Sequence, residues 1–249
     1  MDIKKLIPDS DIRTWVGPFN DKEWYFDLGK EQSEKIIQWL SIKPGHKILD
    51  VGCGCGRIAI HFLNYLDKQG KYVGIDNNKE LLTYCIENIS AAKSNFEFRF
   101  LDVYNGAYAQ DGKLKSNEAA FPSENESVDI VIMCSLFTHM YLDDIDSYLK
   151  EVFRVLKKGG LFLSSLNLYN EFTHNQILMN KAHLDMKYNI TGDSYSLDIE
   201  VPERGFAHQE EKVKELYWKN GFFIKEIKYG IWSTKELTGE FHDYIIAQK

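Results

Sequence analysis

Apolar residues follow two different spacings along the chain. Short continuous apolar runs that end at glycine or an acid indicate buried strands, whereas apolar residues three or four positions apart indicate helices. Five runs predict strands, at 46–52, 71–76, 96–103, 128–135 and 161–167. Three runs between them predict helices, at 56–66, 78–89 and 143–160. Strands that alternate with helices in this way predict an α/β protein with a doubly wound, mostly parallel sheet.

The last of these helices carries signals at both of its ends. Asp143 and Asp144 favour its positive end, and Lys157 and Lys158 favour its negative end. Gly159 is the residue at which we expect the helix to stop, because glycine adopts the backbone conformation that ends many helices.

The two ends of the chain add further elements. A helix at 30–40 precedes the first strand and is expected to cover the sheet. A helix at 210–221 is followed by two strands, at 222–230 and 244–249. Because the link between these strands is short, we expect them to run antiparallel to each other.

Composition narrows the class of protein. The chain is 44% hydrophobic and 27% charged, as in ordinary globular proteins, and its net charge is −7. An acidic balance disfavours a nucleic-acid partner, which would need a basic face. No run approaches the ~20 apolar residues of a membrane-spanning helix, and the first residues lack the apolar core of a secretion signal. We therefore expect a cytoplasmic protein without a membrane partner, and reduced thiols at Cys53, Cys55, Cys85 and Cys134.

The stretch ILDVGCGCGRIAI, residues 48–60, joins the first predicted strand to the first predicted helix. Read from Gly52, the first glycine after the strand, it places Arg57 where a dinucleotide-binding loop has its third small residue. Asp50 ends the strand, and a carboxylate at that point would repel a pyrophosphate and attract a cationic ligand. The loop therefore favours a ligand without phosphates. An NAD-dependent oxidoreductase is the alternative, and a formal glycine match from Gly54 keeps it open.

Two further acids follow predicted strands. Asp76 lies 20 residues after Gly56, at the position where an acid accepts hydrogen bonds from ribose hydroxyls. Asp102 ends the third predicted strand, where its carboxylate could accept from an adenine amino group. Acids at three successive strand ends, with no Lys or Arg inside the glycine loop up to Gly56, indicate a nucleoside ligand without phosphates.

The set of motifs resembles the class I S-adenosylmethionine-dependent methyltransferases. ILDVGCGCGRIA, YVGID and FRFLDV look like their first three motifs, and SVDIVIMCSLFTHM and VFRVLKKGGLFLSS look like their fourth and fifth strand regions. The resemblance extends from about Gly29 to the C-terminus, apart from two long insertions. It implies a seven-stranded sheet and methyl transfer from S-adenosylmethionine, with S-adenosylhomocysteine as the product. It is strongest to bacterial methyltransferases that act on small molecules.

The resemblance also assigns roles to individual residues. Asp50 and the glycine loop would surround the methionine end of the cofactor, Asp76 with Asn77 would hold the ribose, and Asp102 with Val103 would flank the adenine. The backbone after the fourth strand would pass close to the sulfonium. The cofactor-binding residues implied are Asp50, Gly52, Cys53, Gly54, Gly56, Asp76, Asn77, Asp102, Val103, Cys134 and Ser135, with Tyr25 of the aromatic segment before the first strand as a lesser candidate.

His139 follows the fourth strand, where the methyl acceptor should meet the cofactor. A neutral hydroxyl acceptor must lose its proton, and histidine is suited to take it near neutral pH. We therefore expect His139 to act as a base, with Tyr141 as a lesser candidate; the alternative is that His139 only begins the next helix or faces solvent.

The acceptor is expected to be a small-molecule hydroxyl or amine, since CSLFTH stands where methyltransferases of nucleic-acid amino groups carry a different motif. A cofactor-binding protein without catalysis is a third interpretation. No metal site is expected, because Cys53 and Cys55 are spaced C-x-C without a second pair nearby.

Two segments interrupt the alternation of strands and helices. Residues 104–127 are polar and contain glycine and proline, and residues 168–207 precede the last helix. Loops of this length are usually functional or mobile. We interpret 168–207 as a lid over the acceptor; a contact in a homodimer is the alternative. The chain is expected to form one domain with an N-terminal cap region, a cofactor-binding core, this lid, and a C-terminal helix with two strands, at 1–45, 46–167, 168–207 and 208–249.

Overall fold

A computed structural model describes all 249 residues and contains a seven-stranded sheet. The strands lie in the order β10-β11-β5-β4-β1-β2-β3. Their bounds are β1 Lys47–Val51, β2 Lys71–Asp76, β3 Phe96–Phe100, β4 Val128–Met133, β5 Leu156–Leu166, β10 Phe223–Lys228 and β11 Asp243–Gln248. Strands β1 to β5 run parallel, and β11 runs antiparallel to both of its neighbours. The predicted doubly wound α/β fold is confirmed, and so is the antiparallel pairing of the last two strands.

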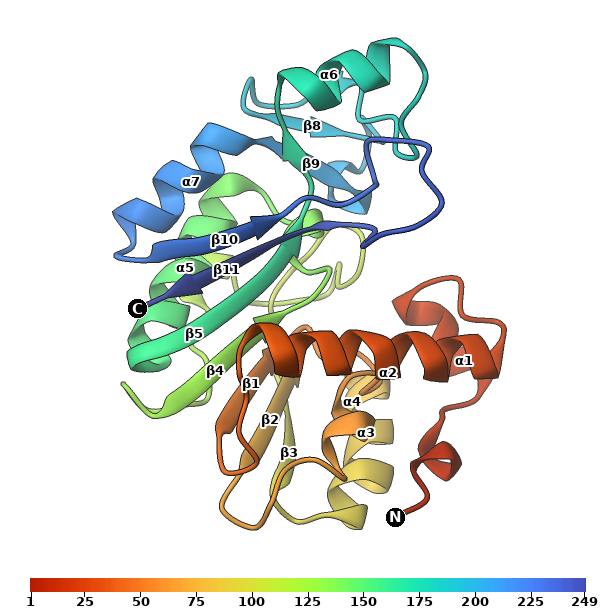
Figure 1. Cartoon of the computed structure of the whole chain (residues 1–249), viewed down its shortest axis with the longest axis vertical. Coiled ribbons are helices and arrows are strands. Elements are labelled where there is room, and N and C mark those ends of the chain that lie inside the picture. The colour runs from red at the N-terminus through yellow and green to blue at the C-terminus, as the bar shows by residue number, and fades with distance from the viewer.

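Helices cover both faces of this sheet (Figure 1). The helices are α2 Lys22–Trp39, α3 Ala59–Phe62 and α4 Lys79–Cys85 on one face, and α5 Leu142–Val155 and α7 Glu210–Lys219 on the other. Successive strand residues point to opposite faces, so Ile48 packs with α2 and α3 while Leu49 packs with α5. Each fully buried aliphatic side chain of this kind contributes about 1.5–3 kcal/mol of transfer free energy.

Residues 168–207, the lid segment, fold beside the carboxyl ends of the strands at the top of Figure 1. The segment contains β6 Leu168–Tyr169, α6 Glu171–Leu178, β7 Tyr188–Asn189 and β8 Ser194–Ser196. Together with β9 Phe206–Gln209 these strands form a second sheet in the order β6-β9-β8-β7. The buried carboxylate of Asp243 ties it to the main sheet, because it accepts from the Leu168 N–H and the Trp232 indole N–H, both at 2.7 Å.

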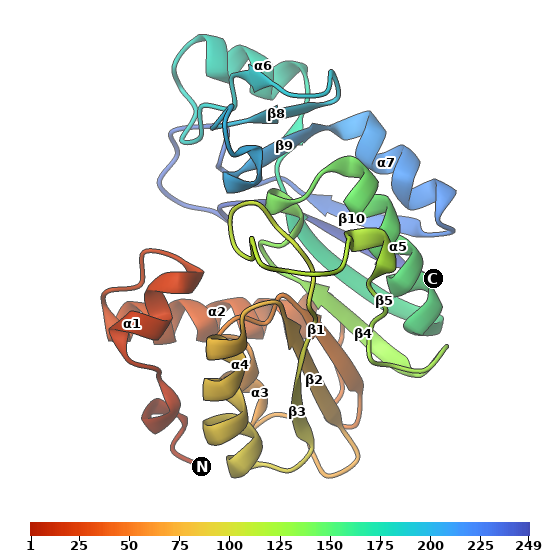
Figure 2. The same ribbon diagram turned by 180° about the vertical axis from the view of Figure 1, so that it is seen from behind.

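The N-terminal cap region folds back toward the same edge of the sheet (Figure 2). It contains α1 Ser10–Arg13, which is followed by the tight turn Thr14–Val16. The guanidinium of Arg13 is buried and donates to the carbonyls of Pro8, Phe19 and Asn20, so it fixes the path of this turn.

Several predicted boundaries are wrong. The helix expected at 56–66 is only α3, and α5 ends at Val155 instead of reaching Gly159. Leu156 is fully buried and already pairs with Val128 of β4, so tertiary packing overrides the helix signals there. Gly159 nevertheless has a left-handed φ of 77°, within the irregular start of β5. The helix expected at 30–40 begins at Lys22, where Asp21 caps it by accepting from the Trp24 N–H. The link between β10 and β11 is also longer than expected, since it spans 229–242.

Membrane-crossing helices are not found, because every helix is too short or too polar to traverse a bilayer.

Candidate functional site

Three glycines shape the turn between β1 and α3. Gly52, Gly54 and Gly56 have φ values of 77°, 54° and 81°, which residues with a Cβ rarely adopt. The N–H of Gly52 donates to the carbonyl of Ile75 at 2.8 Å and so ties the turn to β2. A Cβ on Gly54 would lie 2.6 Å from the side chain of Val16 in the cap region. The turn can therefore adopt this conformation and pack against its neighbours only because these three positions lack side chains.

The cysteines beside the turn are buried thiols. Cys53 is 7% exposed, Cys55 lies 3.2 Å from the hydroxyl of Tyr25, and the thiol of Cys85 donates to the carbonyl of Gly54 at 3.5 Å. Burial raises the pKa of all three thiols, which keeps them protonated and unreactive. Tyr25, a candidate for the pocket wall, is itself fully buried behind the turn.

Asp50 lies beneath the glycine turn and not in its mouth. Its carboxylate is 2% exposed and accepts a hydrogen bond from the hydroxyl of Tyr72 on β2 at 2.5 Å. Burial raises the pKa of Asp50 to about 7; the bond from Tyr72 lowers it, and the charge of Asp76 raises it further. Asp50 can therefore act on a ligand through its charge across the loop, and its ionisation falls near neutral pH.

Asp76 lies at the rim of the same turn. One carboxylate oxygen accepts from the Gly54 N–H at 2.8 Å and the other from the Asn78 N–H at 2.9 Å. Burial raises its pKa, and these backbone bonds oppose that shift. The neighbouring Asn77 donates to the carbonyl of Val103 at 3.3 Å, which links the end of β2 to the segment that follows β3.

Asp102 and Val103 lie just beyond β3. The Asp102 carboxylate accepts from the N–H of Lys113 at 3.4 Å, and its carbonyl accepts from the N–H of Leu114 at 2.8 Å. Val103 is buried at 4% exposure. These contacts tie residues 113 and 114 back to the end of β3, and the bond from Asn77 to Val103 brings this end next to Asp76.

The chain leaves β4 in an unusual conformation. Ser135 has a φ of 57° although it is not glycine, and its N–H donates to the Ser165 hydroxyl of β5 at 2.6 Å. Cys134 before it is partly buried, and burial raises the pKa of its thiol. The side chain of Leu136 then lies over Gly52, at 3.3 Å from the position of a Cβ there. The backbone at Cys134 and Ser135 thus passes directly beside the glycine turn.

His139 lies in the tight turn that precedes α5. Its Nδ1 is 2.8 Å from the carbonyl oxygen of Glu203 and must donate to it, because a carbonyl only accepts. The Nε2 lone pair therefore faces the hydroxyl of Tyr108, at 3.4 Å. Asn105 holds the backbone by donating to the His139 carbonyl at 2.9 Å. Burial lowers the pKa of His139, so the imidazole is neutral and presents an acceptor nitrogen.

Tyr141 directly precedes α5 and contacts the second sheet. Its ring packs edge-on against Phe206 of β9 with 4.8 Å between ring centroids. Burial raises the pKa of its hydroxyl, which therefore remains a neutral donor.

A hollow lies beside Tyr108, the residue whose hydroxyl faces His139. It is lined by Thr14, Trp15, Gly17, Ala107 and Tyr108. The Trp15 and Tyr108 side chains are 50% and 44% exposed, so aromatic surface from the cap region and from the loop 104–127 flanks the opening. Tyr108 therefore contacts both the hollow and His139.

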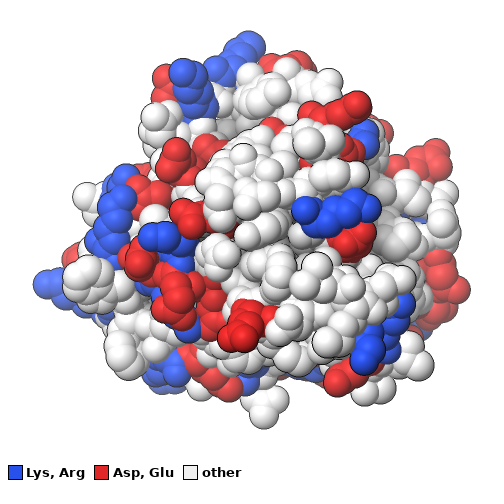
Figure 3. Space-filling model, turned by 90° about the horizontal axis from the view of Figure 1, so that it is seen from above, with Lys and Arg blue, Asp and Glu red and all other residues white.

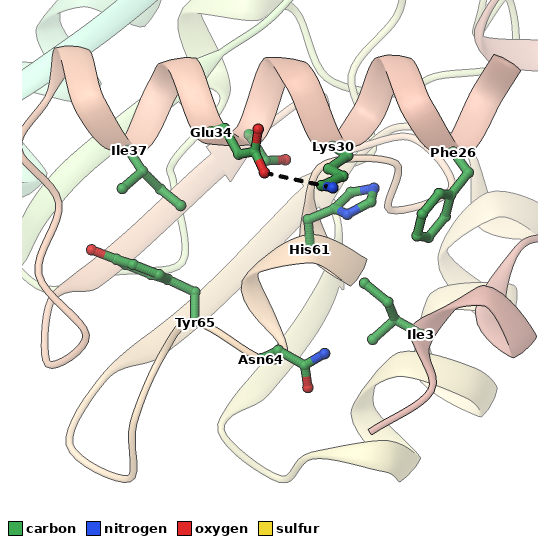
Figure 4. Close-up of a pocket in the computed structure, with 9 residues that line it drawn as sticks. Ile3, Phe26, Lys30, Glu34, Ile37, His61, Asn64 and Tyr65 are labelled. Carbon is green, nitrogen blue, oxygen red and sulfur yellow. Dashed lines mark ion pairs between the residues drawn. The ribbon is translucent and has the colours of Figure 1, made fainter. Parts of the chain in front are cut away.

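A second groove lies elsewhere, on the outer side of α2 and α3 (Figure 4). Phe26 and Ile37 of α2 face His61 and Tyr65 across it, and Lys30 and Glu34 pair at 4.0 Å on its rim. None of the residues predicted from the sequence lines this groove.

Four residues that contact the candidate site or lie near it were not predicted from the sequence: Tyr72, Tyr108, Asn167 and His242. Tyr72 had a signal, because an aspartate inside an apolar strand needs a donor from a neighbouring strand. The other three lie in loops or at strand ends, and only the fold brings them to the edge of the sheet.

Known proteins resemble this chain along most of its length. A family model described as "Methyltransferase domain" matches residues 42–221. A phosphoethanolamine N-methyltransferase of Triticum aestivum is 24% identical over 209 residues, which cover 76% of this chain and 37% of that protein. A tRNA N(3)-cytidine methyltransferase of Gallus gallus is 26% identical over 197 residues, which cover 76% of this chain and 47% of that protein. The chain thus spans less than half the length of these two relatives.

Solved structures share the fold. The crystal structure of an S-adenosylmethionine-dependent methyltransferase from Methanosarcina mazei aligns with a TM-score of 0.55 and 23% identity. The alignment covers 86% of this chain and 96% of that one.

Proposed function

The chain belongs to the methyltransferase domain family and is a class I S-adenosylmethionine-dependent methyltransferase, and we propose on this premise that its methyl acceptor is a small-molecule hydroxyl or amine. The observation that carries the proposal is the neutral His139, whose acceptor nitrogen faces Tyr108, which itself lines the hollow between the cap region and the loop 104–127. The family match also favours methyl transfer over hydride transfer with NAD.

The glycine turn fits S-adenosylmethionine, which when bound supplies a methyl group activated by a positively charged sulfur. Gly52, Gly54 and Gly56 hold the turn in left-handed backbone conformations and pack closely against Leu136, Val16 and Ile89, and we assign to this turn the methionine end of the cofactor. Cys53 contributes backbone to the same turn. Asp50 would favour the cationic end of the ligand through its charge, from beneath the loop.

The nucleoside would be held at the ends of β2 and β3. Asp76 and Asn77 are assigned to the ribose, for which the Asp76 carboxylate would rearrange its present bonds to Gly54 and Asn78. Asp102 and Val103 are assigned to the adenine. The backbone of Cys134 and Ser135 would adjoin the sulfur, because it leaves β4 beside the glycine turn.

His139 is the residue we assign to proton removal. The proton of an O–H or N–H acceptor would pass to the Nε2 lone pair as the acceptor atom gains the methyl group, and the electron pair of the broken C–S bond would remain on sulfur. Nδ1 would keep its bond to the Glu203 carbonyl throughout, so the ring orientation is preserved. The acceptor would have to displace the Tyr108 hydroxyl from Nε2, which places Tyr108 at the acceptor site. Tyr141 is a lesser candidate for contact with the acceptor.

Surface charge supports a small acceptor over a nucleic acid. Figure 3 shows Lys and Arg interspersed with Asp and Glu on the face seen from above, without a continuous basic surface. The net charge of −7 agrees with this, since binding to a phosphate backbone depends on clustered cations. The lid segment lies over the same edge of the sheet and would enclose a small acceptor, as one part of a single domain.

The test is an assay of S-adenosylhomocysteine formation with three sets of acceptors: small hydroxyl compounds, small amines, and unmodified tRNA. The proposal predicts product with at least one small compound and a loss of product in His139→Gln. Turnover with tRNA alone would contradict it. Cofactor binding without turnover of any acceptor would favour the non-catalytic alternative.

A further inference from the structure

A second histidine lies at the same edge of the sheet, and the proposed reaction does not use it. His242 immediately precedes β11, and Asn167 immediately follows β5. Nδ1 of His242 is 2.8 Å from the side-chain oxygen of Asn167. The two residues come from neighbouring antiparallel strands, so the main sheet fixes their separation.

Asn167 decides which nitrogen of His242 carries the proton. Its amide nitrogen donates to the carbonyl of Phe206 at 2.8 Å, so its oxygen must be the atom that faces His242. An amide oxygen only accepts hydrogen bonds, and Nδ1 of His242 is therefore protonated. Asn167 is 1% exposed, and its own carbonyl accepts from the N–H of His208 at 3.0 Å, which holds the side chain in place.

The lone pair of His242 is consequently on Nε2, and this nitrogen is not completely buried. No protein group forms a hydrogen bond with it, and it is not among the buried polar atoms that lack a partner. Burial lowers the pKa of His242 to about 4, and the neighbouring imidazole of His139 shifts it in the same direction, so the imidazole of His242 is neutral under ordinary conditions. Its Nε2 can accept a hydrogen bond but cannot donate one.

The position of His242 suits a side chain that contacts the acceptor at the end remote from the methylated atom. The methyl group is expected at the end of β4, and β11 lies two strands away from β4. Two strand spacings separate β11 from β4 by roughly 10 Å. His139 has the same arrangement, with Nδ1 anchored on a protein oxygen and Nε2 presented as an acceptor. Two neutral acceptor nitrogens at one edge favour a molecule that brings hydrogen-bond donors and disfavour a phosphate or carboxylate.

We propose that His242, oriented by Asn167, binds the methyl acceptor by accepting a hydrogen bond from a neutral hydroxyl or amine that is distinct from the methylated group. The inference rests on the proposed function. It narrows the substrate to small molecules that carry a second neutral donor and that have no anionic group at that end.

The test is nitrogen NMR of the histidine side chains in the chain loaded with S-adenosylhomocysteine. Phenol is the probe, and anisole, which has the same ring but no donor, is its matched control. The proposal predicts the Nδ1–H form for His242, and a shift of its Nε2 resonance to lower frequency with phenol but not with anisole. His183 of the lid segment is the internal control, because its Nε2 donates a hydrogen bond to the carbonyl of Glu236, and the Nε2 resonance of His183 should not respond.

Two variants separate binding from folding. Asn167→Leu should give a mixture of the two neutral forms of His242 and weaken its response to phenol. His242→Gln should remove the preference for phenol over anisole while the chain still binds S-adenosylhomocysteine.

Three results would overturn the inference: an Nε2–H form of His242, an equal response to phenol and anisole, or no response to either. Failure of the proposed function would be seen separately, as a chain that does not bind S-adenosylhomocysteine at all.

Discussion

The hydroxyl of Tyr72 donates to the carboxylate of Asp50 at 2.5 Å, in the apolar layer beneath the glycine turn. The acid that the sequence marks as the partner of a cationic ligand is therefore kept out of the mouth of the turn. Burial raises its pKa to about 7, so it is partly protonated near neutral pH. The stability of the free chain and its affinity for the cofactor should both depend on this one carboxyl.

Asp50→Asn should stabilise the free chain at pH 8. The pKa of Asp50 is about 7 in the fold and about 3.9 in an unfolded chain, so the folded state binds more protons between these values. Stability therefore falls as pH rises through this window, and a neutral amide removes the loss. We expect a gain on the order of 1 kcal/mol at pH 8, or roughly 2–4 °C in the unfolding midpoint, and less at pH 5.

Asp129→Asn is the control with the opposite sign. Its carboxylate pairs with Lys157 at 2.6 Å, and its pKa is lowered although burial raises it, because the hydrogen bonds from Lys157 and Lys47 prevail. This variant should lose stability at pH 8. If Asp50→Asn unfolds at a lower temperature than the wild type at pH 8, the buried charge of Asp50 does not destabilise the fold.

Binding of S-adenosylmethionine should strengthen as pH rises from 6 to 8. Over this range Asp50 ionises and its charge attracts the sulfonium. S-adenosylhomocysteine lacks the sulfonium charge and should show a smaller change. Calorimetric titration of both ligands at the two pH values measures the difference, and Asp50→Asn should flatten it. An equal pH dependence in the variant would assign the effect to another group, such as Asp76.

Gly54→Ala should destabilise the chain and abolish cofactor binding. Its φ of 54° disfavours alanine by about 1–2 kcal/mol, and the new Cβ would overlap Val16. Gly192→Ala is the matched control, since Gly192 has a φ of 85° but no atom within 4 Å of the Cβ position. Thermal unfolding and calorimetry should show the backbone penalty in both variants and lost binding only in Gly54→Ala. Retained binding in Gly54→Ala would place the cofactor elsewhere.

His139→Gln should reduce turnover by roughly 10²–10⁴-fold without changing cofactor affinity, because general-base catalysis has that magnitude. The measurement is kcat for the best small acceptor, with calorimetry for S-adenosylhomocysteine. Tyr108→Phe is the companion variant: it removes the hydroxyl from Nε2 but leaves the base, so it should retain most of the turnover. Normal kcat in His139→Gln would remove the base role from this residue.

The sequence predicted the part of the candidate site whose residues lie close together along the chain. Asp50, the three glycines and Asp76 belong to one strand–turn–helix–strand unit, so their spacing along the chain fixes their neighbourhood. The sequence did not reveal that Asp50 points away from the mouth of the turn, since that depends on Tyr72, a residue on the neighbouring strand.

The acceptor side was much less accessible to prediction. His139 was found because it follows β4, but its partners Tyr108 and Glu203 come from two long insertions. The Asn167–His242 pair spans residues 75 positions apart and forms only when β11 inserts beside β5. The predicted end of α5 was wrong for a similar reason. At Leu156, burial against β4 prevails over the local signals for helix continuation.

Calorimetric titration of S-adenosylmethionine into the wild-type chain and Asp76→Asn tests the central claim most directly. Asp76 joins the glycine turn to the proposed ribose site, and its amide variant keeps one oxygen for the Gly54 or Asn78 N–H. The account predicts that the wild type binds and that the folded variant binds at least about tenfold more weakly, the equivalent of one lost hydrogen bond to a charged group. No heat of binding at millimolar ligand, or equal affinity in the two chains, would contradict it.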